Sequence, residues 1–165
     1  MKVKIVFTEP SNTSIFGKFV IWAIGGRFSH VHFLFDGSST TWTYEAYPPR
    51  VRLFPKDLYP GEGVMIDLPF KHSQAMVLKN QAILESQTKV YSANDALRIF
   101  IRNRISRPLA RWLGKWLHAD KGETCSTLAV RTLRLMWPEF GGKDALEFSP
   151  DEVYQALMKL QESGW

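Results

Sequence analysis

The chain has 165 residues, of which 45% are hydrophobic, so it is long and apolar enough for one globular domain with its own core. A single cysteine excludes an intrachain disulfide, argues against the disulfide-stabilised class of secreted proteins, and favours a reducing compartment. The net charge of +5 indicates an anionic partner only where the charge gathers on one surface. We expect a single domain over residues 1–165.

Two apolar runs near the start of the chain are short. The first, from Met1 to Phe7, is broken by Thr8-Glu9-Pro10 before it reaches the length of a signal-peptide core. The second, residues 19–24, falls far short of the roughly 20 residues that cross a bilayer. Neither a signal peptide nor a membrane span is predicted, and we expect a cytoplasmic protein.

The first half of the chain predicts a small antiparallel sheet. Strand patterns occupy residues 1–7, 29–35, 41–46, 51–53 and 64–68. Turn chemistry at 36–39 joins two of these strands as a hairpin, and Pro48-Pro49 bends the chain before the next strand. Before the second strand, apolar residues from Ser14 to Ala23 recur at helical spacing, and Gly25-Gly26 ends that helix.

The second half predicts helices. Their apolar spacing covers residues 73–87, 94–101, 125–136 and 150–160. Trp137-Pro138 ends the third helix, and Ser149 caps the fourth with Pro150 in its first turn. A sheet followed by helices predicts an α+β fold.

The only cysteine, Cys125, lies where a loop becomes a helix. Unpaired backbone N–H groups and the positive end of the helix dipole favour a thiolate at that position. The alternative is a small apolar residue buried in a core, which is the usual place of a free cysteine. A nearby base decides between them.

His30 and Glu45 are the candidate partners of the thiol. His30, His32 and Leu34 share one face of the second predicted strand, and Glu45 lies on the third. If the register brings the faces together, a cross-strand imidazole and carboxylate can serve as base and orienting group. Either histidine could be the base.

The histidine pair also raises a metal site. A divalent ion would need further ligands, such as Glu45 or His72, and the paired Cys or His spacings of zinc sites are absent. We therefore expect no metal and no other cofactor, and we assign His32 to the lining of a pocket.

Other residues near the thiol could support the reaction. The backbone N–H of Cys125 is disposed to bind an oxyanion, with Thr124 or Ser126 assisting. Tyr44 and Tyr47 flank Glu45 and could line a pocket, although aromatic residues in strands more often belong to a core.

Residues 98–121 form a basic, tryptophan-rich segment. It predicts an amphipathic helix or helical pair with three competing uses. It could be a solvated face over packed tryptophans. It could instead be a lid that binds an anionic substrate or a membrane surface. Nucleic-acid binding is the least favoured use, because no stacking motif accompanies the charge.

Several short motifs resemble a known family in their order and spacing. They are Ser29-His30-Val31 before an apolar strand and Asp36-Gly37, Tyr44-Glu45-Ala46 before Val51, Cys125-Ser126 at a helix start, and Phe148-Ser149-Pro150-Asp151. This order resembles the permuted NlpC/P60 group of papain-like enzymes, of the YiiX and YebB-like type, over residues 11–157. The chain departs from that family at His32, where a glycine is common.

The resemblance implies a circularly permuted papain-like fold with a small antiparallel sheet or partial barrel packed with helices. It implies a cysteine-dependent hydrolase of bacterial or phage type, with Cys125 as nucleophile, His30 as base and Glu45 as orienting residue. The expected substrate is a peptide amide or another acyl-bearing molecule. The alternatives are a lipid-directed thiol acyltransferase or phospholipase of the same fold, and a non-catalytic binding or inhibitory module.

Overall fold

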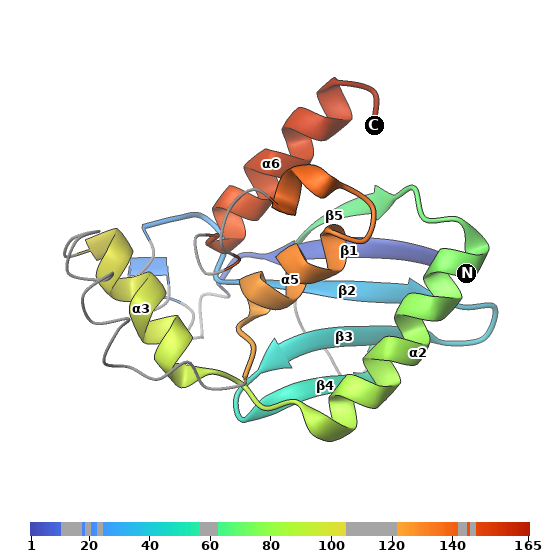
Figure 1. Ribbon diagram of the computed structural model, residues 1–165, viewed down its shortest axis with the longest axis horizontal. Coiled ribbons are helices and arrows are strands. Elements are labelled where there is room, and N and C mark those ends of the chain that lie inside the picture. The colour runs from blue at the N-terminus through green and yellow to red at the C-terminus, as the bar shows by residue number, and fades with distance from the viewer. Residues whose placement is uncertain are drawn as a thin grey trace.

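The computed structural model describes residues 1–10, 18, 21–22, 25–56, 63–104, 122–141, 145 and 148–165. These residues build an open antiparallel sheet of five strands with helices packed against it (Figure 1). The predicted α+β class is thereby confirmed.

The five strands follow the predicted alternation within a few residues. They are β1 (Lys2–Thr8), β2 (His30–Asp36), β3 (Thr41–Tyr47), β4 (Arg50–Pro55) and β5 (Gly63–Leu68). Their order across the sheet is β4-β3-β2-β1-β5, and every neighbouring pair is antiparallel. The β4 strand extends beyond the predicted residues 51–53 at both ends, and residue 52 pairs with residue 45 in its ladder with β3.

Helices supply the second layer. The described ones are α2 (His72–Thr88), α3 (Ala93–Arg104), α5 (Cys125–Leu133) and α6 (Pro150–Glu162), with a short 3-10 helix at Pro138–Gly141. Figure 1 shows α2 and α5 across the same face of the sheet. The α5 helix ends at Leu133, three residues before the predicted end, and continues as turns to Met136.

The main core lies between the sheet and these two helices. Phe33, Phe35 and Tyr44 are completely buried on the covered face of the sheet, and Leu128 and Leu133 of α5 pack onto it. Burying each such side chain contributes about 1.5–3 kcal/mol before the entropy cost of folding is subtracted. This packing fixes α5, and therefore its first residue, relative to the strands.

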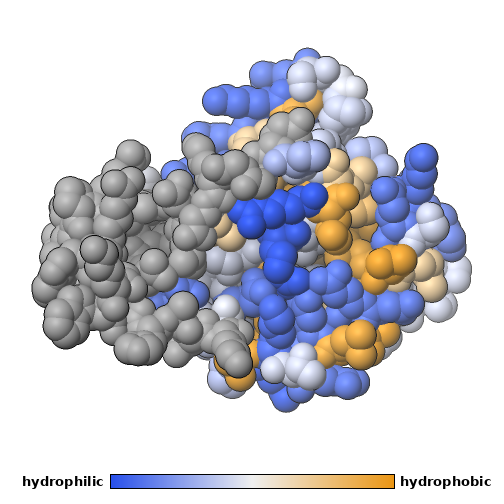
Figure 2. Space-filling view, in the orientation of Figure 1, coloured by the Kyte–Doolittle hydropathy of each residue, from blue (hydrophilic) through white to orange (hydrophobic). Residues whose placement is uncertain are grey.

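The α2 helix differs from its predicted pattern at one position. Ala75, Leu78 and Ala82 are buried as expected, but Ile83 is exposed and Glu85 is buried in its place. Figure 2 shows apolar residues next to hydrophilic ones on the surface over α2. Val77 and Leu84 are the most exposed apolar residues of this helix. None of the described helices has the length and apolar character needed to span a membrane.

Two predicted features lie mostly or wholly outside the described residues. One is the helix over residues 14–23, and the other is the part of the basic 98–121 segment that follows α3.

Candidate active site

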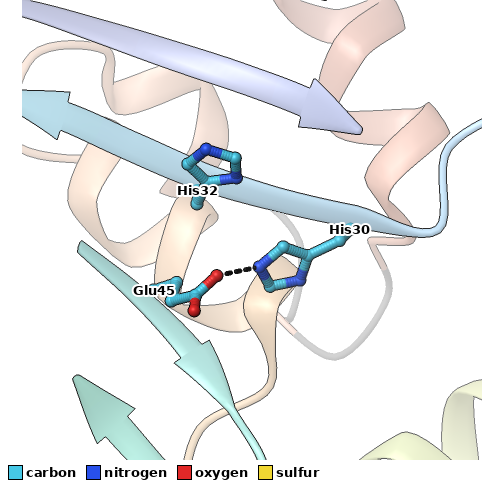
Figure 3. Close-up of side chains that lie close together, drawn as sticks. All are labelled: His30, His32 and Glu45. Carbon is cyan, nitrogen blue, oxygen red and sulfur yellow. Dashed lines mark hydrogen bonds and ion pairs between the residues drawn. The ribbon is translucent and has the colours of Figure 1, made fainter. Parts of the chain in front are cut away.

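The candidate site lies where β2 and β3 separate. Their ladder pairs Phe33–Asp36 with Thr41–Tyr44 and ends there. Extending that register would set Glu45 opposite His32, so Glu45 reaches His30 along a diagonal. Figure 3 shows the side chains of His30 and Glu45 meeting in the opening between the two strands.

His30 and Glu45 form a short, buried contact. His30 Nε2 lies 2.6 Å from Glu45 Oε2, and the Glu45 side chain is fully buried whereas that of His30 is 12% exposed. A carboxylate on one ring nitrogen fixes the tautomer of an imidazole and stabilises its protonated form. The structure thus brings together the two residues that the hairpin interpretation paired.

Arg52 completes the contacts of the carboxylate, and the sequence interpretation missed it. Its Nε and Nη2 lie 2.6 Å and 2.5 Å from Glu45 Oε1, on the oxygen that His30 does not use. Glu45 and Arg52 are direct partners in the β3–β4 ladder. Counting outward from the Pro48-Pro49 turn could have placed the arginine opposite the glutamate.

The thiol of Cys125 interacts with His30. Burial lowers the pKa of His30, but its hydrogen bonds with Cys125 and Glu45 and the electrostatic attraction of both groups outweigh burial and raise the pKa to about 10. Because Nε2 is engaged by Glu45, Nδ1 is the ring nitrogen that can face the thiol. Cys125 itself is partly exposed.

Burial raises the pKa of Glu45. The hydrogen bond and charge of His30 and the charge of Arg52 outweigh burial, so the pKa lies below its ordinary value. A thiol at the start of α5 and a carboxylate of β3 therefore both interact with an imidazole of β2. No protein-family model matches the chain, and no curated protein matches its sequence. The roles of these residues accordingly rest on their own contacts.

The start of α5 is tied to the far edge of the sheet. Glu123 N donates to Val90 O, and Ser92 N donates to Glu123 O, while Tyr91 N donates to Pro49 O beside β4. A side chain at Gly122 would come within 3.0 Å of this backbone, so a glycine is required there. The position of the thiol is thus set by backbone hydrogen bonds as well as by core packing.

The hydroxyl groups next to Cys125 cap its helix. Thr124 accepts a hydrogen bond from Thr127 N, and Thr127 Oγ1 accepts one from Thr124 N. Ser126 Oγ lies 3.3 Å from Thr124 Oγ1, and both side chains are buried. Their hydroxyls are therefore engaged in the cap, and the oxyanion donors that helix geometry leaves available are the backbone N–H groups of Cys125 and Ser126.

The two tyrosines beside Glu45 face different ways. Tyr44 is completely buried and donates a hydrogen bond of 2.5 Å to Glu85 of α2, so its predicted place in a pocket is wrong. Alternation along β3 turns it away from Glu45. Tyr47 is 39% exposed, and its ring meets that of His30 edge-on at 5.9 Å. Tyr47 therefore flanks the imidazole.

His32 is buried beside His30. The two rings stack at 5.6 Å, and His32 is 2% exposed. Burial, and then the charge of His30, lower the pKa of His32 to about 3, so it stays neutral at physiological pH. Since Glu45 contacts His30, these findings favour His30 as the base. His72 lies elsewhere, at the start of α2, with its ring 3.2 Å from the Met1 amino group.

Asp151 of α6 holds the segment that leads into β2. Its carboxylate accepts hydrogen bonds from the backbone N–H groups of Arg27 and Phe28 at 2.7 Å and 3.2 Å. A Cβ at Gly26 would collide with this carboxylate at 1.9 Å. The Ser149-Pro150-Asp151 motif therefore both starts a helix and fastens the chain just before His30.

Proposed function

We propose that this protein is a cysteine-dependent hydrolase of the amidase or peptidase type, with a permuted papain-like fold. Cys125 is the nucleophile, His30 the base and Glu45 the orienting residue. The observation that carries the proposal is the two-sided engagement of His30, with Glu45 on Nε2 and the thiol of Cys125 interacting with the same ring.

The first half-reaction forms an acyl-enzyme. His30 takes the thiol proton, and the Cys125 sulfur attacks the carbonyl carbon of the substrate. The carbonyl oxygen becomes an oxyanion that accepts hydrogen bonds from the backbone N–H groups at the start of α5. Glu45 stabilises the imidazolium during this step. His30 then donates its proton to the leaving amine or alcohol as the bond to it breaks.

The second half-reaction releases the acid. Neutral His30 takes a proton from water, and the resulting hydroxide attacks the thioester carbon. The thiolate leaves, and the imidazolium of His30 returns the proton to it, which restores the thiol and the neutral imidazole. Lipid-directed acyl transfer would use the same first half-reaction and differ in the group that accepts the acyl chain.

Labelling of the thiol tests the nucleophile and its base. Cys125 is the single cysteine, so intact mass reports alkylation by iodoacetamide at this one residue. We expect His30→Ala to slow labelling at pH 6 by about 100-fold, within the range for a positioned base, and Glu45→Gln to slow it less. His72→Ala is the matched control, because His72 contacts the amino terminus instead, and it should label at the wild-type rate.

Equal labelling rates in all four proteins would show that the thiol acts without His30 and would rule out the triad. With labelling established, a panel of peptide amides, isopeptides and acyl esters identifies the bond that is cleaved. Release of the amine from an amide supports the amidase assignment, whereas cleavage of long-chain esters alone favours the lipid-directed alternative.

A further inference from the structure

The proposed reaction assigns no role to His32. This imidazole is 2% exposed and projects from the same face of β2 as His30, two residues along the strand. The ring lies beside His30 and Glu45, and the three side chains form a cluster that could hold a metal ion. We therefore consider which ligand His30, His32 and Glu45 could bind together.

Three potential ligand atoms converge at this point. One nitrogen from each of His30 and His32 and one oxygen of Glu45 all lie within 4.8 Å of one another. Figure 3 shows the two rings and the carboxylate gathered at the separation of β2 and β3. In a tetrahedral zinc site, ligand atoms about 2.1 Å from the ion are roughly 3.4 Å apart, so shifts of about 1 Å would suffice.

We propose that His30, His32 and Glu45 bind Zn²⁺ reversibly, and that the bound ion inactivates the enzyme. Two imidazole nitrogens and one carboxylate oxygen form a common zinc ligand set with a fourth position open to water. The binding claim stands on this cluster alone, whereas the inactivation claim rests on the proposed function.

The surroundings fit such a site. Arg52 holds Oε1 of Glu45, which leaves Oε2 to contact His30. An outer partner of this kind fixes the orientation of a ligating carboxylate. Both His32 and Glu45 are buried on paired strands, and entry is through the partly exposed edge at His30. The two strands therefore hold His32 and Glu45 in place, and an ion can enter from the side of His30.

Zinc binding and the catalytic contact exclude each other. Nε2 of His30 now meets Glu45 Oε2, and an ion placed between these atoms takes the position of the hydrogen bond. The imidazole is then neither oriented by Glu45 nor able to stabilise a charged thiolate partner. The Cys125 thiol remains in place but loses its base, so inhibition needs no contact between zinc and sulfur.

Competition with a chromophoric zinc chelator measures binding directly. We expect one Zn²⁺ per wild-type chain, and at least 10- to 100-fold weaker binding by His32→Gln, since loss of an outer partner alone costs that much. His72→Gln and Cys125→Ala should bind as the wild type does. Unchanged zinc affinity in His32→Gln, or its loss in Cys125→Ala, would overturn the proposal.

Labelling by iodoacetamide with and without Zn²⁺ tests inactivation. The ratio of the two rates should be large in the wild type and near one in folded His32→Gln. A ratio that stays large in that variant assigns inhibition to Cys125 and His30 alone and contradicts the proposal. If His30→Ala labels as fast as the wild type without zinc, the proposed function has failed, and the chelator titration still decides whether the metal site exists.

Discussion

Two buried glutamates, Glu45 and Glu85, show how similar pairs can serve different ends. Each carboxylate is paired with an arginine, Arg52 or Arg131. Glu45 belongs to β3, and Glu85 of α2 contacts that strand. Glu85 also accepts hydrogen bonds from Tyr44 and from Gln81 of its own helix. Because Tyr44 and Glu45 are neighbours on β3, the two carboxylates lie on opposite faces of the sheet.

The difference lies in the partners that can change their charge. Around Glu85 the partners are an arginine, a tyrosine and an amide, so its contacts are constant near neutral pH. Glu45 contacts the imidazole of His30 in addition to its arginine. This imidazole can exchange protons, and it interacts with the thiol of Cys125. Both carboxylates are therefore buried and ion-paired, but we expect chemical reactivity only at the site that contains Glu45.

The largest expected effect comes from breaking the Glu85 pair. Arg131→Met leaves that carboxylate buried without its cation, removes the ion pair of Arg131 with Glu123 as well, and should lower the free energy of unfolding by about 3–5 kcal/mol. Arg52→Met should cost less, because Glu45 keeps His30 and Arg52 is 39% exposed. Urea unfolding at pH 7 measures both. Equal losses would remove the distinction between the two sites.

Acid should act on the Glu85 site in a defined window. Burial raises the pKa of Glu85, but Arg131, Tyr44 and Gln81 together lower it from 4.5 to about 2. A lowered folded pKa stabilises the fold above pH 4.5, and this stability is lost as the pH falls towards 2. The contribution is about 3 kcal/mol. Glu85→Gln should be less stable than the wild type at pH 7, and the gap should narrow by pH 3 in urea unfolding.

Replacing Arg52 should alter reactivity with pH. Arg52→Gln removes a charge that lowers the pKa of Glu45, so the carboxylate protonates at higher pH and the acidic limb of the labelling rate moves upward. At pH 6 we expect a loss of about tenfold, or about 1.4 kcal/mol in the barrier. The exposed neighbour Arg50→Gln is the control. An unmoved acidic limb would show that Arg52 only supports the fold.

The smallest expected effect concerns Asp151, whose carboxylate accepts hydrogen bonds from backbone N–H groups. Asp151→Ala removes the acceptor for Arg27 N and Phe28 N and should cost about 1 kcal/mol of stability. Asp151→Asn retains one acceptor oxygen and should lose less. If the alanine variant costs as much as Arg131→Met, pairing with a cation is not what makes the Glu85 site strong.

Much of this architecture could be predicted from the sequence, because its patterns are local. Alternation located the strands, the Ser149-Pro150 start located α6, and the hairpin interpretation brought His30 near Glu45. The loop-to-helix transition also located the start of α5 at Cys125.

What could not be predicted depends on long-range pairing. No local pattern showed that the β2–β3 ladder would end before His30, or that Glu85 would take a buried position facing Tyr44. The engagement of Thr124 in a cap was equally hidden, since a threonine before a helix has the same sequence signature whether its hydroxyl is capping or free.

The backbone bonds between residues 90–92 and Glu123 have a consequence for how this protein could diversify. They bring the two ends of the intervening chain, residues 93–121, to one point at the sheet edge. The entropy cost of closing a loop grows only slowly with the number of residues in the loop. We therefore expect changes in the length of that segment to displace Cys125 little, which makes it a practical insertion point for engineering.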